Sequence, residues 1–259
     1  MLRGLTAVAG RRTLYAAGAC SASALAIASQ QPSSHCLFGG ESYHLRYFDA
    51  RGAAETARML MVLGGSTFTD DRWPLDFSKS RNEMSPGMNS ARANGLLAAN
   101  LDRAPVLVVN GKHEIGQSKS IERYLSKKLG LLGGDDIEAA QIDAFTEHMR
   151  DVKDKYNKAK GTTDEAAKKK ALAAFFESTL PELFLKIEAR CTGGGAPVIG
   201  KALSYADVSL YILCREYFDN KDGVAAALKS CPRMLASVDA VSQHPRVATY
   251  LAQRPVTKV

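Results

Sequence analysis

The stretch that decides the fold runs from Tyr43 to Arg58 and reads YHLRYFDARGAAETAR. Its first half alternates in the manner of a half-buried strand, and its second half carries residues that favour a helix. Tyr47 stands near the end of the strand, close to the start of the helix. The first N–H groups of a helix have no partner within it and, with the helix dipole, attract negative charge. A hydroxyl at this junction can therefore help to hold an anion, and a thiolate is an anion.

The segments that follow predict a small sheet with helices. Asn110-Gly111 is a strong hairpin signal between two β-rich runs, and Val106–Val109 is typical of a buried central strand. The order of elements is that of a thioredoxin-like domain. The expected elements are a strand over 44–48, a helix over 55–63, an edge strand over 68–73, strands over 106–109 and 112–115, and a helix with its apolar face at Ile121, Tyr124, Leu125 and Leu129.

The second half of the chain predicts only helices. Long amphipathic helices are expected over 135–156 and 168–190, with shorter ones over 232–243 and 245–251. Ser204 and Asp207 match a capping box ahead of an apolar run. The sequence therefore predicts an α/β thioredoxin-like domain over 41–129, a glycine-rich linker and an all-α domain over 135–259.

Composition and charge indicate an ordinary soluble globular chain. Of 259 residues, 46% are hydrophobic and 24% charged, with a formal charge of +7. Three arginines precede the first acidic residue, Glu41, and most other excess charge lies in 153–160 and 168–170, beside acids. No aromatic residues alternate with these lysines, which favours solvated helix faces over a nucleic-acid surface.

The cysteines indicate neither a disulfide scaffold nor a metal site. Five of them, Cys20, Cys36, Cys191, Cys214 and Cys231, are scattered without a CxxC pair, and the five histidines are scattered too. An odd, dispersed set favours a reducing compartment. Cys214 and Cys231 are expected to be small buried apolar residues.

The first forty residues differ from the rest. Arg3, Arg11 and Arg12 lie among many alanines and serines, and no Asp or Glu occurs before Glu41. This composition is typical of an organellar transit segment, which predicts mitochondrial import and cleavage near 29–40, with a plastid as the alternative. The apolar run over 14–28 is shorter than the ~20 residues that span a bilayer. A retained leader would instead anchor the chain in an organellar membrane.

Three motifs in their order carry a resemblance to a known family. They are the Tyr43–Arg58 stretch, Arg103-Ala104-Pro105-Val106-Leu107, and Gly116-Gln117-Ser118 at the start of a helix. Over residues 43–259 the sequence resembles a cytosolic-type glutathione transferase, closest to the sigma class that includes the glutathione-dependent prostaglandin D synthases. The resemblance implies a homodimer that uses glutathione as co-substrate with a small hydrophobic electrophile.

The resemblance also implies the site. Tyr47 matches the catalytic tyrosine, whose hydroxyl would stabilise the glutathione thiolate. Pro105 matches a cis-proline that exposes the backbone of Ala104 to the tripeptide. Gln117 and Ser118 match the pair that binds the γ-glutamyl carboxylate at a helix start. Taken alone, Tyr47 could be a strand aromatic, and the Gln-Ser pair a helix cap.

Further matches lie around this set. Trp73 matches a tryptophan that contacts the glycyl end, Arg103 would replace a lysine there, and Asp151 matches an acid that reaches the γ-glutamyl amine from the partner subunit. Two family contacts are missing, because Ala53 stands where an arginine is frequent and Phe77 where a lysine is expected. The segment 85–100 is expected to be an insertion.

Three functions remain open from the sequence. The first is a glutathione transferase that conjugates or isomerises small electrophiles. The second is a non-catalytic accessory subunit of an organellar membrane complex, anchored through residues 1–40, since a fold does not fix a function. The third is glutathione-dependent redox work, which a CxxC pair would support, and the sequence has none.

Overall fold

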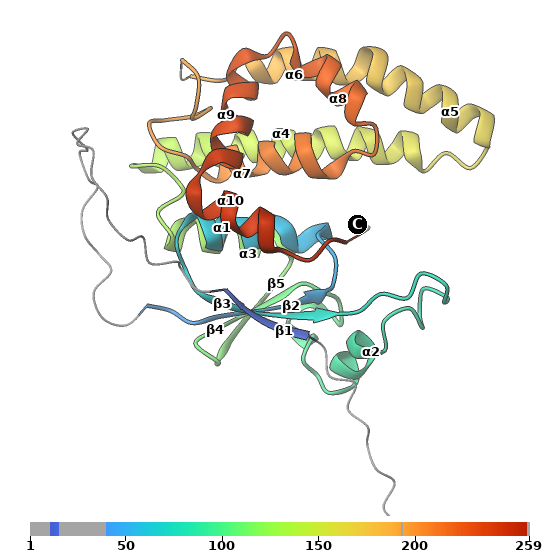
Figure 1. Ribbon diagram of the computed structural model, residues 1–259, viewed down its shortest axis with the longest axis vertical. Helices are drawn as coiled ribbons and strands as arrows, with labels where there is room; N and C mark the ends of the chain where they lie inside the picture. Colours follow the sequence, from blue (N-terminus) through green and yellow to red (C-terminus); the bar gives the residue numbers. More distant parts are fainter. Residues whose placement is uncertain (1–10, 16–39, 193, 258–259) are drawn as a thin grey trace, which may run out of the picture. The chain divides into compact units, whose positions relative to one another are not determined.

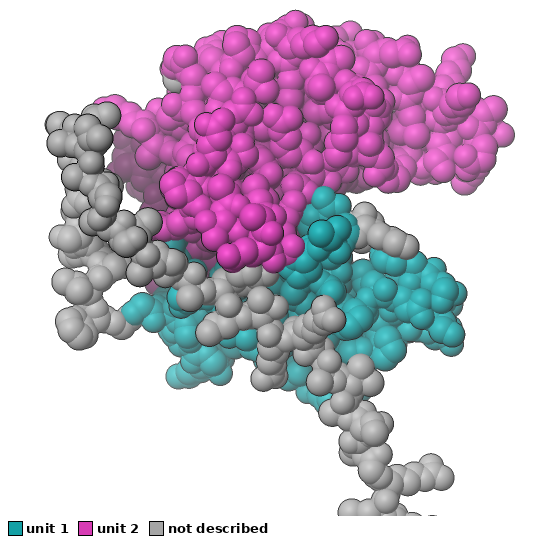
Figure 2. All heavy atoms as spheres, in the orientation of Figure 1, with its two compact units in different colours: residues 1–54, 65–121, 255–259 teal, residues 55–64, 122–254 magenta. Residues whose placement is uncertain are grey.

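The computed structural model describes residues 11–15, 40–192 and 194–257, and of residues 11–15 only the backbone. Internal contacts divide the chain into two compact units, shown in teal and magenta in Figure 2. Unit 1 comprises residues 1–54, 65–121 and 255–259, and unit 2 comprises 55–64 and 122–254. The predicted leader, residues 1–40, lies outside the described residues except for 11–15 and 40.

Unit 1 is built on a five-stranded sheet with the strand order β1-β3-β2-β4-β5 (Figure 1). Strands β2 and β3 are parallel, and the other neighbouring pairs are antiparallel. The strands are β1 (Arg11–Tyr15), β2 (Tyr43–Phe48), β3 (Phe68–Trp73), β4 (Val106–Val109) and β5 (His113–Gly116).

The predicted strands are present, with one correction. Burial alternates along β2, every residue of β4 is buried, and Asn110 and Gly111 both have positive φ, 55° and 65°, in the turn that leads to β5. The prediction that Phe68–Trp73 forms an edge strand is wrong. Strand β1 pairs with its outer side, in a register from Arg11 opposite Arg72 to Tyr15 opposite Phe68.

The predicted insertion forms a helical excursion between β3 and β4. It contains helix α2 (Pro86–Ala93) and a 3-10 turn over Ala98–Asn100. Helix α2 packs against β3, where Ala91 joins Trp73, Leu97 and Val106 in one buried cluster. Gly87 permits this approach, because a Cβ there would lie 2.9 Å from the Trp73 ring. The insertion is therefore part of the core of unit 1.

Unit 2 is helical, apart from its turns and loops (Figure 1). Its helix α1 packs with α7 and α10 and therefore belongs to unit 2. The sequence instead predicted that residues 55–63 belong to the first domain, which was expected to end at residue 129. Helix α3 (Ser118–Lys128) begins in unit 1 and continues in unit 2. The helices of unit 2 are α1 (Glu55–Leu63), α4 (Asp136–Lys160), α5 (Glu165–Ala174), α6 (Leu180–Glu188), α7 (Tyr205–Tyr211), α8 (Lys221–Leu228), α9 (Pro232–Gln243) and α10 (Pro245–Gln253), with π turns over Phe175–Thr179 and Ile212–Tyr217.

The predicted capping box opens helix α7 and is confirmed. Asp207 is fully buried and accepts hydrogen bonds from the backbone N–H groups of Val198 and Ser204, both at 2.9 Å. The hydroxyl groups of Ser204 and Ser237 donate to the same carboxylate at 3.0 and 2.6 Å. Burial raises the pKa of Asp207, while these four donors oppose that shift. The box therefore also joins α7 to the preceding loop and to α9.

The prediction that Cys214 and Cys231 are small buried residues is confirmed. Cys214 and Cys231 are buried, as is Cys191, and all three are free thiols. No helix within residues 11–15, 40–192 and 194–257 is long and apolar enough to cross a membrane.

Candidate functional site

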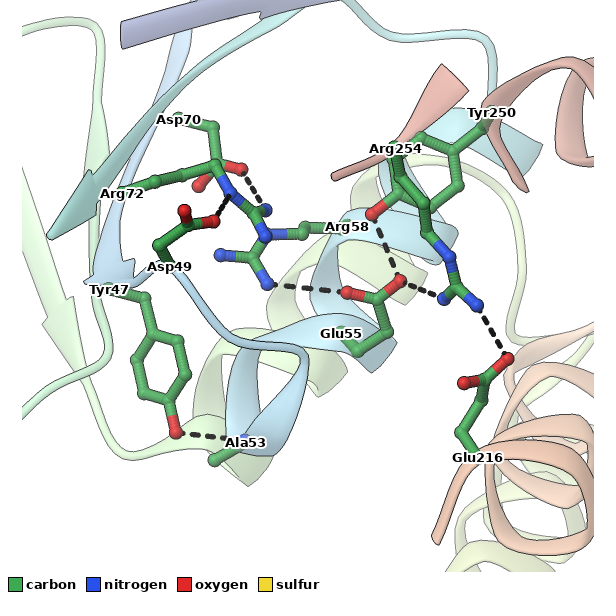
Figure 3. Close-up of polar contacts among 10 residues, drawn as sticks. All are labelled: Tyr47, Asp49, Ala53, Glu55, Arg58, Asp70, Arg72, Glu216, Tyr250 and Arg254. Atoms are coloured by element: carbon green, nitrogen blue, oxygen red, sulfur yellow. Dashed lines mark hydrogen bonds and ion pairs between the residues drawn. The ribbon is translucent and has the colours of Figure 1, made fainter. Parts of the chain in front are cut away.

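Tyr47 lies at the end of β2, with its ring buried and its hydroxyl at the next turn of the chain (Figure 3). Its Oη accepts a hydrogen bond from the backbone N–H of Ala53 at 3.0 Å. Gly52 makes this approach possible, because its φ is +40° and a Cβ there would lie 2.6 Å from the hydroxyl oxygen. An oxygen that accepts from a backbone N–H keeps its own proton for donation. The geometry is compatible with a hydroxyl that donates toward an anion, and that role of Tyr47 stays a prediction.

The turn after Tyr47 is fixed by a buried arginine in the neighbouring strand (Figure 3). Arg72 on β3 is 2% exposed and donates from Nε to Asp49 at 2.8 Å and from Nη1 to Asp70 at 3.0 Å. The Asp49 N–H also donates to the carbonyl oxygen of Trp73 at 2.7 Å. A buried guanidinium needs such partners. This cluster therefore holds the 49–52 turn, which leads from Tyr47 to its partner Ala53.

The first residue of helix α1 is fixed within unit 2. Glu55 is 1% exposed, and its Oε1 accepts from the Tyr250 hydroxyl at 3.0 Å and from Arg254 at 2.6 Å (Figure 3). Its Oε2 accepts from Arg58 at 3.3 Å, and Arg254 also donates to Glu216 at 2.8 Å. Ala53, the partner of Tyr47, lies two residues before Glu55 in the chain. These ion pairs therefore hold the first residue of helix α1, which follows the Tyr47–Ala53 contact in the chain.

The cis-proline loop is joined to the start of α3 by one side chain, Asn100. Its amide nitrogen donates to the Pro105 carbonyl oxygen at 2.9 Å, and its oxygen accepts from the Gln117 N–H at 3.1 Å. Asn100 is 4% exposed, and the Ala104–Pro105 peptide bond is cis. At Gly116 a Cβ would run into the Ala99 carbonyl oxygen and would lie 2.8 Å from the Cα of Asn100. The end of the insertion therefore packs directly on the site.

Gln117 and Ser118 stand at the opening of α3, as predicted. Gln117 is exposed and has a φ of 64°, a left-handed conformation that is uncommon outside glycine. Ser118 is half-buried and begins the helix. A non-glycine residue held in this region is often part of a binding site. A carboxylate at this position would meet free N–H groups and the positive end of the helix dipole.

Arg103 and Ala104 directly precede Pro105 in the chain, and Trp73 ends strand β3. Arg103 is exposed, Ala104 is half-buried, and both line a pocket of about 430 Å³ to which the insertion contributes Ser85, Met88, Asn89 and Arg92. Trp73 is 6% exposed and belongs to the cluster beneath α2. The tryptophan therefore serves as a core residue of unit 1, and its contact with a glycyl end stays a prediction.

Asp151 lies in unit 2, on α4, with its side chain exposed. It lines a hollow between α4 and α6 with His148, Lys155, Lys186 and Arg190. The structure thus gathers the Asn100, Ala104, Pro105 and Gln117 group in unit 1, and Asp151 is on the helical unit. Its expected role concerns a second copy of the chain.

Sequence reasoning missed several residues that support the site. Asn100 lies in the insertion and bonds mainly to backbone groups, so no residue pattern marked it. The Arg72 cluster joins β3 to Asp49, the residue directly after β2, and only the pairing of these two strands reveals it. Glu55 carried a weak signal, because an acidic residue in the first turn is typical of a helix start.

Comparisons with known proteins agree with this arrangement. The family model described as glutathione S-transferase, C-terminal domain, matches residues 150–254. A glutathione S-transferase of Dirofilaria immitis is 29% identical over 221 residues, which cover 84% of this chain and 96% of the relative. Glutathione S-transferase P 10 of Caenorhabditis elegans is 30% identical over 220 residues, which cover 83% of this chain and 93% of the relative.

A solved structure has the same architecture. The prostaglandin synthase D of Nilaparvata lugens aligns with a TM-score of 0.66 at 25% identity, covering 83% of this chain and 100% of that one. The fold and the site thus define a two-domain protein with a thioredoxin-like domain followed by an all-helical domain. With the near-complete coverage of its relatives, the chain belongs to the glutathione transferase family.

Proposed function

We propose that the protein is a glutathione transferase that activates the glutathione thiol for attack on small hydrophobic electrophiles or for isomerisation. The observation that carries this proposal is the position of the Tyr47 hydroxyl, which accepts from the Ala53 N–H at 3.0 Å at a helix start. A free thiol has a pKa near ~8.5, so glutathione is mostly protonated at neutral pH. A donor directed at sulfur and a nearby helix N-terminus both favour the thiolate.

The remaining candidate residues would hold the tripeptide. Ala104 would offer its N–H and C=O to the cysteinyl part next to Pro105, and Gln117 and Ser118 would bind the γ-glutamyl carboxylate. Arg103 is exposed, which supports a role toward the glycyl carboxylate. Trp73 is 6% exposed, so little of its side chain is accessible to a ligand.

We also propose a homodimer in which Asp151 reaches the γ-glutamyl amine of the partner's glutathione. Exposure of Asp151 on α4 supports this role, since a buried acid could not reach another copy. None of the comparisons points to a subunit of a membrane complex, so that alternative is not proposed.

The leader supports a proposal of mitochondrial import, based on its basic, acid-free composition. Cleavage near 29–40 would remove β1, and β3 would then become the outer strand of the sheet. Mass spectrometry of the native N-terminus in the soluble and membrane fractions of the organelle tests this. A mature start near residue 40 in the soluble fraction supports import, and an intact Met1 peptide in carbonate-washed membranes contradicts it.

The test of the activity is conjugation of glutathione to 1-chloro-2,4-dinitrobenzene by the purified full-length protein. The thiolate sulfur forms a bond to the ring carbon, chloride leaves with the bonding electrons, and the thiol proton passes to solvent. We expect a glutathione-dependent rate that saturates with glutathione and exceeds the uncatalysed reaction. A protein that binds glutathione without accelerating conjugation or isomerisation of any electrophile would contradict the proposal.

A further inference from the structure

The C-terminal segment, from Arg254 to Thr257, bonds to the chain at two places near the start of α1. Arg254, the C-cap of α10, donates from Nη1 to Glu55 Oε1 at 2.6 Å, a contact within unit 2. The Thr257 carbonyl oxygen accepts a hydrogen bond from Nη2 of Arg51 at 3.4 Å, a contact within unit 1. One short segment therefore holds both ends of the turn that leads into α1.

The turn between these two contacts carries the hydrogen bond on which the Tyr47 hydroxyl depends. Ala53 lies midway in the turn, and its N–H donates to the Tyr47 Oη at 3.0 Å. Little room is left for adjustment, because a Cβ at Gly52 would lie 2.6 Å from the same oxygen. Hydrogen bonds weaken steeply when donor and acceptor lose their alignment. A small displacement of the turn therefore changes the direction of the hydroxyl group.

The contact of Arg254 with Glu55 is buried and charged. Glu55 is 1% exposed, and the Arg254 side chain is 16% exposed. Oε1 of Glu55 also accepts from the Tyr250 hydroxyl at 3.0 Å, and Oε2 accepts from Arg58 at 3.3 Å. The other terminal nitrogen of Arg254 donates to Glu216 at 2.8 Å (Figure 3). Removal of one partner from such a group leaves an uncompensated buried charge, which is strongly unfavourable.

We propose that Arg254 is a positioning residue for the Tyr47 hydroxyl, and that the C-terminal segment sets the direction of the Ala53 N–H by holding the chain on either side of it. Arg254 holds the first residue of α1 through Glu55, and Thr257 holds the other side of the turn. Arg254 also neutralises a buried carboxylate in the first turn of α1, where an unpaired negative charge would oppose a thiolate. The proposal rests on the proposed role of Tyr47 in activating the glutathione thiol.

The test measures the ionisation of bound glutathione as well as the rate. The ultraviolet absorbance of the thiolate is followed against pH in the full-length protein saturated with glutathione, and the rate of conjugation to chlorodinitrobenzene is measured over the same pH range. Arg254→Met should raise the pKa of the bound thiol, so that the thiolate fraction at pH values below it falls by about tenfold. The rate should fall by the same factor at low pH and recover toward that of the unmodified protein at high pH.

Two further variants separate positioning from a loss of stability. Arg254→Lys keeps the charge but not the fork that bridges Glu55 and Glu216, and it should restore most of the thiolate fraction. Arg233→Met is the matched control, because it breaks another ion pair of unit 2, in which Arg233 donates to the buried Glu188 at 2.9 Å. It should lose stability in urea, as Arg254→Met does, and keep the pH profile of the unmodified protein.

The second contact of the segment is tested on its own. Arg51→Met removes the hydrogen bond to Thr257 and leaves the ion pairs of Glu55 intact. It should raise the pKa of the bound thiol to a smaller extent, because the bond it removes is long. This variant decides the matter if circular dichroism shows that Arg254→Met does not fold.

Three outcomes would overturn the proposal. The first is a thiol pKa in Arg254→Met, or in Arg51→Met, that equals that of the unmodified protein. The second is a rate in Arg254→Met that falls by one factor at every pH, which indicates only a loss of folded protein. The third is an unmodified protein that forms no thiolate and catalyses no conjugation. In that case the proposed function itself fails, and the result is seen before any variant is compared.

Discussion

The side-chain oxygen of Asn100 accepts a hydrogen bond from the backbone N–H of Gln117 at 3.1 Å, across 17 positions of the sequence. The other end of the same amide donates to Pro105 at 2.9 Å. One buried side chain thus sets the spacing between the loop that would bind the cysteinyl part of glutathione and the turn that would bind its γ-glutamyl part.

Asn100→Ala should weaken glutathione binding by about 1 to 3 kcal/mol, because the Pro105 carbonyl oxygen and the Gln117 N–H lose their partner. The effect should appear in KM for glutathione, with kcat little changed. Asn100→Asp keeps an acceptor for Gln117 but places a carboxylate against the Pro105 carbonyl oxygen, so it should not rescue the loss. Steady-state kinetics of both variants is the measurement, and an unchanged KM in both would contradict the role.

Tyr47→Phe should lower turnover by about 10- to 100-fold, which corresponds to ~1.4–3 kcal/mol of lost transition-state stabilisation. Glutathione affinity should change little, since the tripeptide is held by other residues. Tyr43→Phe is the matched control. Tyr43 lies on the same face of β2 and its hydroxyl donates to Glu41, so that variant should retain turnover. Equal rates for the Tyr47 variant and the unmodified protein would disprove the assignment.

Replacing both Gln117 and Ser118 with alanine should abolish retention on immobilised glutathione. Each lost hydrogen bond to a charged carboxylate costs ~1.5–3 kcal/mol. Ser120→Ala, on the exposed face of the same first turn, should be retained. Retention of the double variant would place the γ-glutamyl site elsewhere.

Asp207→Asn should destabilise the protein by about 2 to 4 kcal/mol, measured by urea unfolding. The asparagine amide nitrogen would face donors that now point at a carboxylate, namely the Val198 and Ser204 N–H groups or the two hydroxyl groups. Asp239→Asn removes an exposed acid from the neighbouring helix α9 and should cost far less. Equal stability of the two variants would contradict the buried network.

The three buried thiols should resist alkylation of the folded protein at pH 8. Burial raises the pKa of Cys191 and Cys214 to about 12 and that of Cys231 to about 11, so the reactive thiolate is scarce well below those values. Their reactivity should rise only as the pH approaches these values or as the protein unfolds. Peptide-resolved mass spectrometry after iodoacetamide treatment, with and without urea, measures each site. Rapid labelling of any of the three in the folded protein would contradict this burial.

Local patterns predicted the elements well where one signal dominated. Helix α1 and helix α9 have the predicted bounds, because glycines end the first and a proline begins the second. The Asn110-Gly111 turn and the capping box at Ser204 depend only on residues that are close in the sequence. The long helix expected over 168–190 is instead divided by a π turn at Phe175–Thr179, which no residue pattern marked.

By itself the sequence determined the order of β2, α1, β3, β4, β5 and α3, the position of Tyr47 at a strand-to-helix junction, and the cap of α7, since each depends on residues near one another in the chain. Only the tertiary structure decided that β1 covers the outer side of β3, that α2 packs on Trp73, and that Asn100 joins Pro105 to Gln117. These features depend on which backbone groups and side chains meet after the chain folds back on itself. These contacts form because buried polar groups must be hydrogen-bonded and apolar surface is buried on folding. Neither requirement produces a periodic pattern in the sequence.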